Sequence, residues 1–179
     1  MVNDEANFSE AEFGTVREKT VTWHDPLTVA ALAPTLSGRR FLEAIRDGIL
    51  PAPPIGRLMG FAIDEIGDGR VVFRCVPDES LYNPIGVVHG GLVCTLADTV
   101  IGCSVHSLLE PGVAYTSIDL NVNYLRPVRA DGGALTATGV VTKSGRRVAF
   151  ASAEIVDADN RVVATGSGSV LIMDPRSTS

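Results

Sequence analysis

The sequence lacks long apolar runs and an excess of positive charge, and each absence excludes a class of protein. No apolar run approaches the roughly 18–20 residues needed to span a bilayer, so no membrane partner is expected. Lys and Arg number 15 against 21 Asp and Glu, which gives a formal net charge of −6. Because nucleic-acid binding depends on Lys and Arg at the phosphates, this balance argues against a nucleic-acid partner.

Targeting signals and paired cysteines are also absent. The start of the chain is acidic and has no basic region leading into an apolar stretch, which argues against a signal peptide. The three cysteines, Cys75, Cys94 and Cys103, have no paired spacing. Free thiols in a reducing compartment are the simplest interpretation, so we expect a cytoplasmic protein.

Standard catalytic and metal-binding motifs are missing as well. The sequence has no Walker-type phosphate loop, no G-x-G-x-x-G and no G-x-S-x-G motif. The three histidines, His24, His89 and His106, have no metal-ligand spacing to one another or to the cysteines, so no metal site is expected. Cys94 and Cys103 fall in an apolar stretch and are interpreted as small buried side chains rather than nucleophiles.

Composition divides the chain into a lead segment, residues 1–54, a compact domain, residues 55–174, and a tail, residues 175–179. The lead segment begins polar and acidic. It then carries apolar residues at the spacing of a short amphipathic helix that begins after Ser37 and ends near Gly48. The prolines that follow favour an extended connection into the compact domain.

The compact domain combines strand patterns with one long helix. Residues 89–109 are apolar on nearly all sides, which is typical of a buried helix. The predicted strands are 58–66 and 70–76 before the helix, and 114–124, 134–142, 148–156 and 161–172 after it. This order does not fit a doubly wound parallel sheet. It predicts an α+β domain in which an antiparallel sheet wraps around the helix.

Two features of the predicted helix are candidates for a catalytic role. It opens with Gly90 and Gly91, whose unscreened amides lie at the positive end of the helix dipole, a position suited to an oxyanion. Asp98 follows among apolar residues, where burial of an ionised carboxylate is costly, so it is a candidate acid, base or nucleophile. A polar position that caps a neighbouring strand is the alternative interpretation of Asp98.

The spacing of these two features indicates a site between subunits. Eight residues separate Gly90 from Asp98, which is about 12 Å along a helix, and catalytic contacts need distances near 3 Å. Two antiparallel copies of the helix, related by a two-fold axis, would bring Asp98 of one chain to Gly90 of the other.

The pattern of Asn83, Gly86, His89, Gly90 and Gly91, followed by Asp98, resembles hotdog-fold acyl-CoA thioesterases of the phenylacetate-degradation (PaaI-like) type. Residues 115–127 and 145–149 resemble two further blocks of that family. The resemblance implies a hotdog fold, an antiparallel sheet around one long central helix, in a homodimer or homotetramer. It also implies hydrolysis of an acyl-CoA thioester to a free acid and CoA, with no metal or organic cofactor.

The resemblance assigns a role to each catalytic position. Asp98 is the general base that activates water or the nucleophile that attacks the thioester carbon, and the Gly90 amide polarises the carbonyl. Asn83 and His89, from the subunit opposite Asp98, hold the thioester and the helix entrance. For His89, structural support is favoured over proton transfer. Ser117 orients the carboxylate or its water, and strand alternation puts only one of Ser117 and its neighbour Thr116 on that face.

The resemblance further implies a set of substrate-binding residues. These are Gly91, Thr116, Arg126, Arg129, Gly145, Arg146 and Arg147. The four arginines lie near the CoA phosphates in the family, and plain surface charge is the alternative interpretation.

Two other functions on the same fold stay open, as do the acyl group and the role of the lead segment. A hotdog enoyl-CoA hydratase or dehydratase needs a histidine and an acid placed to move protons at the α and β carbons. A non-catalytic acyl-CoA-binding protein needs no such groups. The lead helix, with Phe41, Leu42 and Ile45, covers the acyl pocket or extends the dimer.

Overall fold

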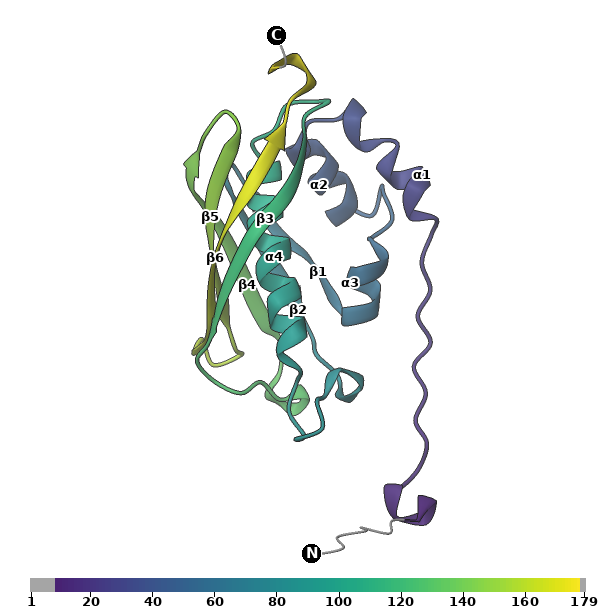
Figure 1. Ribbon diagram of the computed structural model, residues 1–179. Coiled ribbons are helices and arrows are strands. Elements are labelled where there is room, and N and C mark those ends of the chain that lie inside the picture. The colour runs from purple at the N-terminus through teal and green to yellow at the C-terminus, as the bar shows by residue number, and fades with distance from the viewer. Residues whose placement is uncertain (1–8, 178–179) are drawn as a thin grey trace, which may run out of the picture.

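A six-stranded antiparallel sheet wraps around one long helix in the computed structural model, which describes residues 9–177 (Figure 1). The strand order is β1-β2-β4-β5-β6-β3. The strands are β1 (Phe61–Gly67), β2 (Arg70–Cys75), β3 (Ala114–Tyr124), β4 (Leu135–Ser144), β5 (Val148–Val156) and β6 (Val162–Met173). The helices are α1 (Pro26–Ala30), α2 (Gly38–Arg46), α3 (Pro54–Met59) and α4 (Gly90–His106), with short 3₁₀ turns between them. The predicted α+β hotdog architecture is confirmed.

Most predicted elements are present with small shifts at their ends. The helix after Ser37 is α2, and the Ser37 hydroxyl accepts a hydrogen bond from the Arg40 N–H at 3.4 Å. The turn at 67–69 joins β1 and β2 as an antiparallel hairpin. The strand predicted from Leu58 was wrong at its start, because α3 occupies 54–59 and β1 begins at Phe61. Pro54 takes the first helical position, where a missing N–H costs nothing, so the prolines begin a helix there.

The core lies between α4 and the concave face of the sheet. Leu96, Val100 and Ile101 are at most 1% exposed. Gly139 of β4 lets the helix lie directly on the strand, since a Cβ there would sit 2.1 Å from the Val100 carbonyl oxygen. At Gly168 of β6, a Cβ would lie 2.7 Å from the Asp119 carbonyl oxygen of β3, so glycine allows these two strands to approach closely. The helix that carries the candidate residues is therefore held rigidly against the sheet.

Strand β3 forms one edge of the sheet and contains a β-bulge. In its register with β6, Ser117 pairs with Val170 and Asp119 pairs with Ser169, so Ile118 is the extra residue. Because the bulge absorbs this residue, positions on both sides of it face α4. Tyr115 contacts His106, and Leu120 packs against the core. No other strand in residues 9–177 pairs with the outer edge of β3.

The N-terminal part of the chain covers α4 on the side away from β4, β5 and β6 (Figure 1). Before α1, residues 14–25 run as an extended segment that two basic side chains attach to the domain. The Lys19 ammonium lies 2.6 Å from the Asp78 carboxylate, and the Arg17 guanidinium lies 2.8 Å from that of Glu79. None of the helices in the described part of the chain is long and apolar enough to cross a membrane.

Candidate active site

His89 caps the N-terminus of α4 through a ring nitrogen. Its Nδ1 accepts a hydrogen bond from the Gly91 N–H at 2.8 Å. A neutral imidazole that accepts at Nδ1 carries its proton on Nε2, so this contact uses the ring as a cap. This geometry agrees with the structural role favoured for His89. It also means that the Gly91 N–H already has an acceptor and is not free to bind a ligand.

The Gly90 amide is the donor that stays available at this helix end. Gly90 is the first residue of α4, where an N–H has no partner within the helix. No residue in the range 9–177 accepts a hydrogen bond from it. The Gly90 N–H therefore points its partial positive charge outward, as an oxyanion donor must.

Asn83 shapes the loop that leads into α4. Its Oδ1 accepts from the Ile85 N–H at 3.1 Å and from the Val87 N–H at 3.2 Å. Gly86 has a φ of +79°, a conformation that glycine adopts without strain. The side-chain NH₂ of Asn83 has no acceptor among the described residues, so it is available to a ligand.

Tyr124 at the end of β3 supports the same helix end and was not singled out from the sequence. Its hydroxyl lies 3.2 Å from the Gly90 carbonyl oxygen and 2.8 Å from the Cys94 Sγ. A tyrosine has one hydroxyl proton, so it donates to the carbonyl while the Cys94 thiol donates to the hydroxyl oxygen. Gly90, Tyr124 and Arg126 line a hollow of about 460 Å³.

Asp98 and Ser117 meet midway along α4. The Ser117 hydroxyl donates to Asp98 Oδ1 at 2.6 Å, so Ser117, and not Thr116, faces the helix. Both side chains are exposed in the single chain. Our expectation that apolar helix neighbours bury the Asp98 carboxylate was wrong, because Asp98 lies on the part of α4 that faces the open edge at β3.

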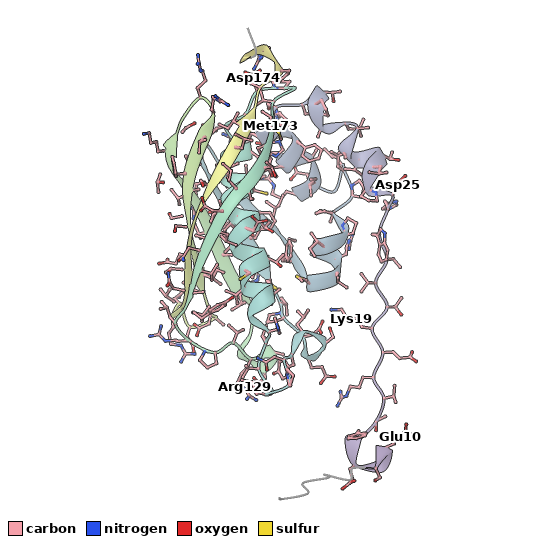
Figure 2. All side chains as sticks on the ribbon, viewed as in Figure 1. Glu10, Lys19, Asp25, Arg129, Met173 and Asp174 are labelled. Carbon is pink, nitrogen blue, oxygen red and sulfur yellow. The ribbon has the colours of Figure 1, made fainter. Side chains whose placement is uncertain are left out.

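The two halves of the candidate site stay apart within one chain. α4 is an uninterrupted helix, so the eight residues from Gly90 to Asp98 span about 12 Å. The expected gathering of arginines also fails within one chain. Figure 2 shows Arg129 at one end of the molecule and Met173 at the other. The Arg147 carbonyl accepts from the Ile172 N–H, which places the Arg146–Arg147 turn at the Met173 end.

Ordinary structural contacts occupy Arg126, Arg129 and Gly145. Arg126 donates to the Val162 carbonyl, and Arg129 pairs with Asp131 at 3.0 Å. Gly145 donates its N–H to the Val148 carbonyl in the β4–β5 turn, where a Cβ would lie 2.4 Å from that oxygen. Arg126 contacts Val162 at one end of β6, and Arg147 contacts Ile172 at the other end. The ten residues between these contacts span about 33 Å of strand, so the two pairs of arginines lie far apart.

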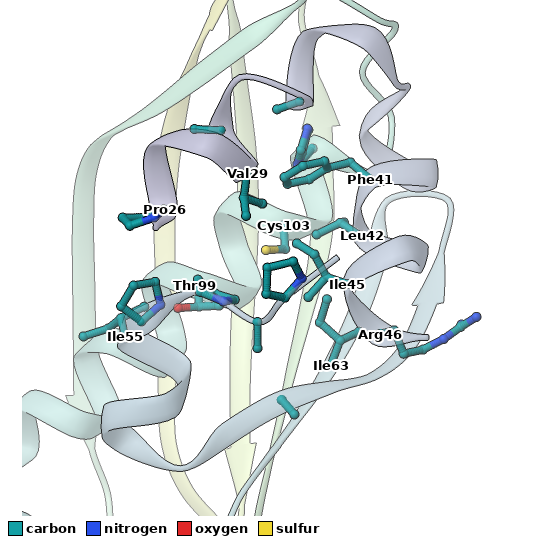
Figure 3. A pocket seen from close by; sticks show the side chains of 18 of the residues that line it. Pro26, Val29, Phe41, Leu42, Ile45, Arg46, Ile55, Ile63, Thr99 and Cys103 are labelled. Atoms are coloured by element: carbon teal, nitrogen blue, oxygen red, sulfur yellow. The ribbon is translucent and has the colours of Figure 1, made fainter. Parts of the chain in front are cut away.

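An apolar cavity of about 580 Å³ lies on the other side of Asp98 from the helix N-terminus (Figure 3). Thr99, Cys103 and His106 of α4 form its floor, and the N-terminal helices cover it. Burial lowers the pKa of His106 from 6.5 to about 4, so the imidazole is neutral near pH 7. Its ring packs against the rings of Phe41 and Tyr115.

The cysteines have the features of structural thiols. All three are free, and burial raises the pKa of Cys75 to about 11 and that of Cys103 to about 12. A thiol so far from ionisation is a poor nucleophile at neutral pH. Cys103 is therefore not a nucleophile, as expected, but it and Cys94 are half-buried, and only Cys75 is fully buried. No group of three His, Cys, Asp or Glu side chains that could hold a metal ion occurs within residues 9–177.

Comparisons with known proteins converge on one family. The model of the thioesterase superfamily matches residues 85–164. Human acyl-coenzyme A thioesterase 13 is 34% identical over 101 residues, which cover 55% of this chain and 69% of that protein. The N-terminal helices lie outside the family match.

Solved structures agree with this. A thioesterase from Haemophilus influenzae has a TM-score of 0.66 and 25% identity, over 74% of this chain and 90% of that one. A hypothetical thioesterase from Streptococcus pneumoniae, solved with coenzyme A, has a TM-score of 0.59 and 27% identity, over 64% and 86%. The E. coli PaaI protein, at 24% identity over 78% of this chain and 96% of that one, shares the fold with a TM-score of 0.67.

Proposed function

The chain belongs to the thioesterase superfamily and is a thioester hydrolase, and from this premise we propose that it hydrolyses acyl-CoA at a site built by two subunits. One observation carries the proposal. The free Gly90 N–H and the Asp98 carboxylate, which accepts a hydrogen bond from Ser117 of β3, are the two reactive features of α4. They lie about 12 Å apart on one rigid helix. One thioester carbonyl can contact both only if they come from different copies of the helix.

In the proposed reaction, the thioester oxygen accepts a hydrogen bond from the Gly90 N–H of one subunit. The helix dipole adds to the stabilisation of the oxyanion that forms. Asp98 of the other subunit takes a proton from water, whose oxygen attacks the carbonyl carbon. The carbon–sulfur bond then breaks, and the CoA thiolate receives the proton held by Asp98.

The second route has Asp98 attack the carbon directly. It forms an anhydride and releases CoA, and water then hydrolyses the anhydride to the free acid and the carboxylate. Ser117 orients the carboxylate in either route. Both routes use only water and the thioester, so we assign no metal or organic cofactor, and the free thiols favour the cytoplasm.

The outer edge of β3 supports a two-fold dimer. It is an 11-residue edge strand whose second side has no partner in the described chain, and exposed edges of this length favour pairing with another strand. Antiparallel pairing of β3 with its copy would run the two α4 helices in opposite directions. That arrangement would bring Asp98 of one subunit toward Gly90 of the other, and would bring the distant arginine pairs of two chains toward one CoA. A homotetramer would add sheet-to-sheet packing of two such dimers.

Subunit complementation tests the shared site. We take Asp98→Ala and Gly90→Pro, since proline removes the N–H and is favoured at the first helical position. His89, with φ −63° and ψ 136°, already has the extended conformation that a following proline requires. Each variant alone should lose nearly all thiol release. In a refolded equal mixture, half the dimers are hybrid and one of their two sites is intact, so about a quarter of the activity should return.

A mixture that stays inactive, while chromatography shows hybrid dimers, would contradict the shared site. The same preparations also separate the alternative functions. Hydration of crotonyl-CoA without thiol release would identify a hydratase, and binding of acyl-CoA without either reaction would identify a binding protein. Loss of thiol release in Asp98→Ala, with unchanged unfolding free energy, supports hydrolysis by the proposed residue.

A further inference from the structure

The cavity beside Asp98 is built largely by a part of the chain that the family match does not cover. We call residues 24–55 the N-terminal cover. It includes α1, α2 and the prolines before α3, and it lines the cavity from above α4. Without the cover, the stripe of Thr99, Cys103 and His106 on α4 would face solvent.

The cavity starts next to the candidate carboxylate on α4 and extends along β3 toward His106. On α4, Thr99 lines it and is the residue after Asp98. On β3, Tyr115 lines it and faces the helix two positions before Ser117, the partner of Asp98. A thioester carbonyl at Asp98 would therefore lie at the mouth of this cavity, with its acyl group directed inside.

The interior is apolar, and the basic residues in its lining are Arg46, the exposed His24 and the neutral His106. Val29, Phe41, Leu42 and Ile45 point inward, and the Arg46 side chain points away from the cavity (Figure 3). Arg46 is also paired with Asp47 at 2.8 Å. A carboxylate at the far end of an acyl group would be buried without a partner, at a cost of several kcal/mol. Dicarboxylic acyl groups are therefore disfavoured.

The far end of the cavity is closed by rings. The His106 ring lies 5.8 Å from that of Phe41 and 4.9 Å from that of Tyr115, centroid to centroid. The start of α2 packs against the end of α4 behind them, where a Cβ on Gly38 would lie 1.8 Å from the His106 carbonyl oxygen. This wall fixes the depth of the cavity.

The depth gives the length of the acyl group. Asp98 and His106 are eight residues apart on α4, which is about 12 Å. An extended chain advances about 1.2 Å per covalent bond, so about ten bonds span this distance. The van der Waals radius of the terminal methyl group takes up the length of about two of them. We propose that the N-terminal cover forms the acyl pocket of this enzyme, and that the pocket selects an uncharged straight-chain acyl group of about eight to ten carbons. This inference rests on the proposed function, since it takes Asp98 as the place of the carbonyl.

The experiment compares acyl-CoA substrates on the full-length enzyme. We measure kcat/KM by thiol release for acetyl-, butanoyl-, octanoyl-, decanoyl-, hexadecanoyl-, succinyl- and phenylacetyl-CoA. Octanoyl- or decanoyl-CoA should exceed each of the others by at least about tenfold, since each well-packed methylene adds a substantial binding free energy. A maximum at any of the other five substrates overturns the inference.

A matched pair of variants on α1 tests the role of the cover. Val29 lines the cavity, and Leu27 on the same helix is 77% exposed and does not line it. Val29→Phe fills the pocket and should lower the octanoyl-to-butanoyl ratio of kcat/KM at least about tenfold. Leu27→Phe should keep the wild-type ratio. If Val29→Phe fails to fold, Ala33→Phe, which also faces the cavity, replaces it, with exposed Ala31→Phe as its control.

Equal ratios in the lining and exposed variants overturn the inference. Calorimetric binding to the Asp98→Asn enzyme separates this result from a failure of the proposed function. Octanoyl-CoA should bind at least about tenfold more tightly than acetyl-CoA, and Val29→Phe should abolish the difference. Selective binding without hydrolysis would refute the proposed function and keep the pocket. Hydrolysis without selectivity would refute the pocket and keep the function.

Discussion

Removal of the Ser117 hydroxyl tests whether the Asp98 carboxylate works as an oriented group. In Ser117→Ala, the 2.6 Å hydrogen bond to Asp98 Oδ1 is lost. Hydrogen bonds to charged groups contribute about 1.5–3 kcal/mol, and each 1.36 kcal/mol in the barrier changes a rate tenfold. Both side chains are exposed in the single chain, so water there would weaken the bond. We therefore expect kcat to fall about 10-fold, and nearer to 100-fold if a partner subunit excludes water from the pair.

The assay is thiol release at saturating octanoyl-CoA, with the unfolding free energy measured alongside. Thr116→Ala is the matched control, because Thr116 is adjacent on β3 and faces away from α4. It should stay within about twofold of the wild type, as surface substitutions usually do. Ser117→Thr keeps a hydroxyl and should recover most of the rate. The reasoning is refuted if Ser117→Ala matches the wild type, or if Thr116→Ala loses as much activity as Ser117→Ala.

Three further predictions follow from the contacts of α4. Gly90→Pro should lower kcat by about 10²–10³, since it removes one oxyanion donor; an active variant would exclude that role. Its Cβ would lie 3.1 Å from the Tyr124 ring, so the unfolding free energy is measured alongside. His89→Ala should lose about 1 kcal/mol of unfolding free energy, or about 2–4 °C in melting temperature, while His89→Asn keeps a cap; equal melting temperatures would contradict the capping role. The fold disfavours the protonated form of His106. The unfolding free energy is therefore unaffected by this group above its unfolded pKa of 6.5, and it decreases as the pH falls from there toward about 4. Between pH 7 and pH 5, the wild type should lose about 2 kcal/mol more unfolding free energy than His106→Phe, as measured by urea titration at each pH. An equal loss in the two proteins would show that His106 is not the group responsible.

The strands and the long helix could be predicted because their patterns are local and agree with the tertiary packing. β3 and β5 have the predicted bounds, and α4 begins one residue after its His89 cap. The α3 helix was missed because three prolines near residue 54 suppress a helical interpretation, although Pro54 stands at the one helical position that accepts it. Position within an element, and not residue type alone, decides the effect of a proline.

The candidate site could be predicted only in part. His89 and Asn83 act through hydrogen bonds to backbone N–H groups a few residues away, so their sequence spacing indicates their arrangement. The exposure of Asp98 depends on which sheet edge is open, and the separation of the arginines depends on the length of β6. Tyr124 acts through contacts 30 and 34 residues away in sequence. These features depend on the order and length of the strands in the sheet, which a local sequence pattern does not indicate.

The bulge at Ile118 also determines how β3 would respond to a change in its length. In a regular strand, deletion of one residue reverses the direction of every later side chain. In β3, Ile118 has no partner on β6, since Ser117 and Asp119 pair with the adjacent residues Val170 and Ser169. Deletion of Ile118 would leave Ser117 and Leu120 on the helix side and turn β3 into a regular strand. Relatives one residue shorter at this point can therefore keep the same inward residues, and alignments of β3 should place a gap there.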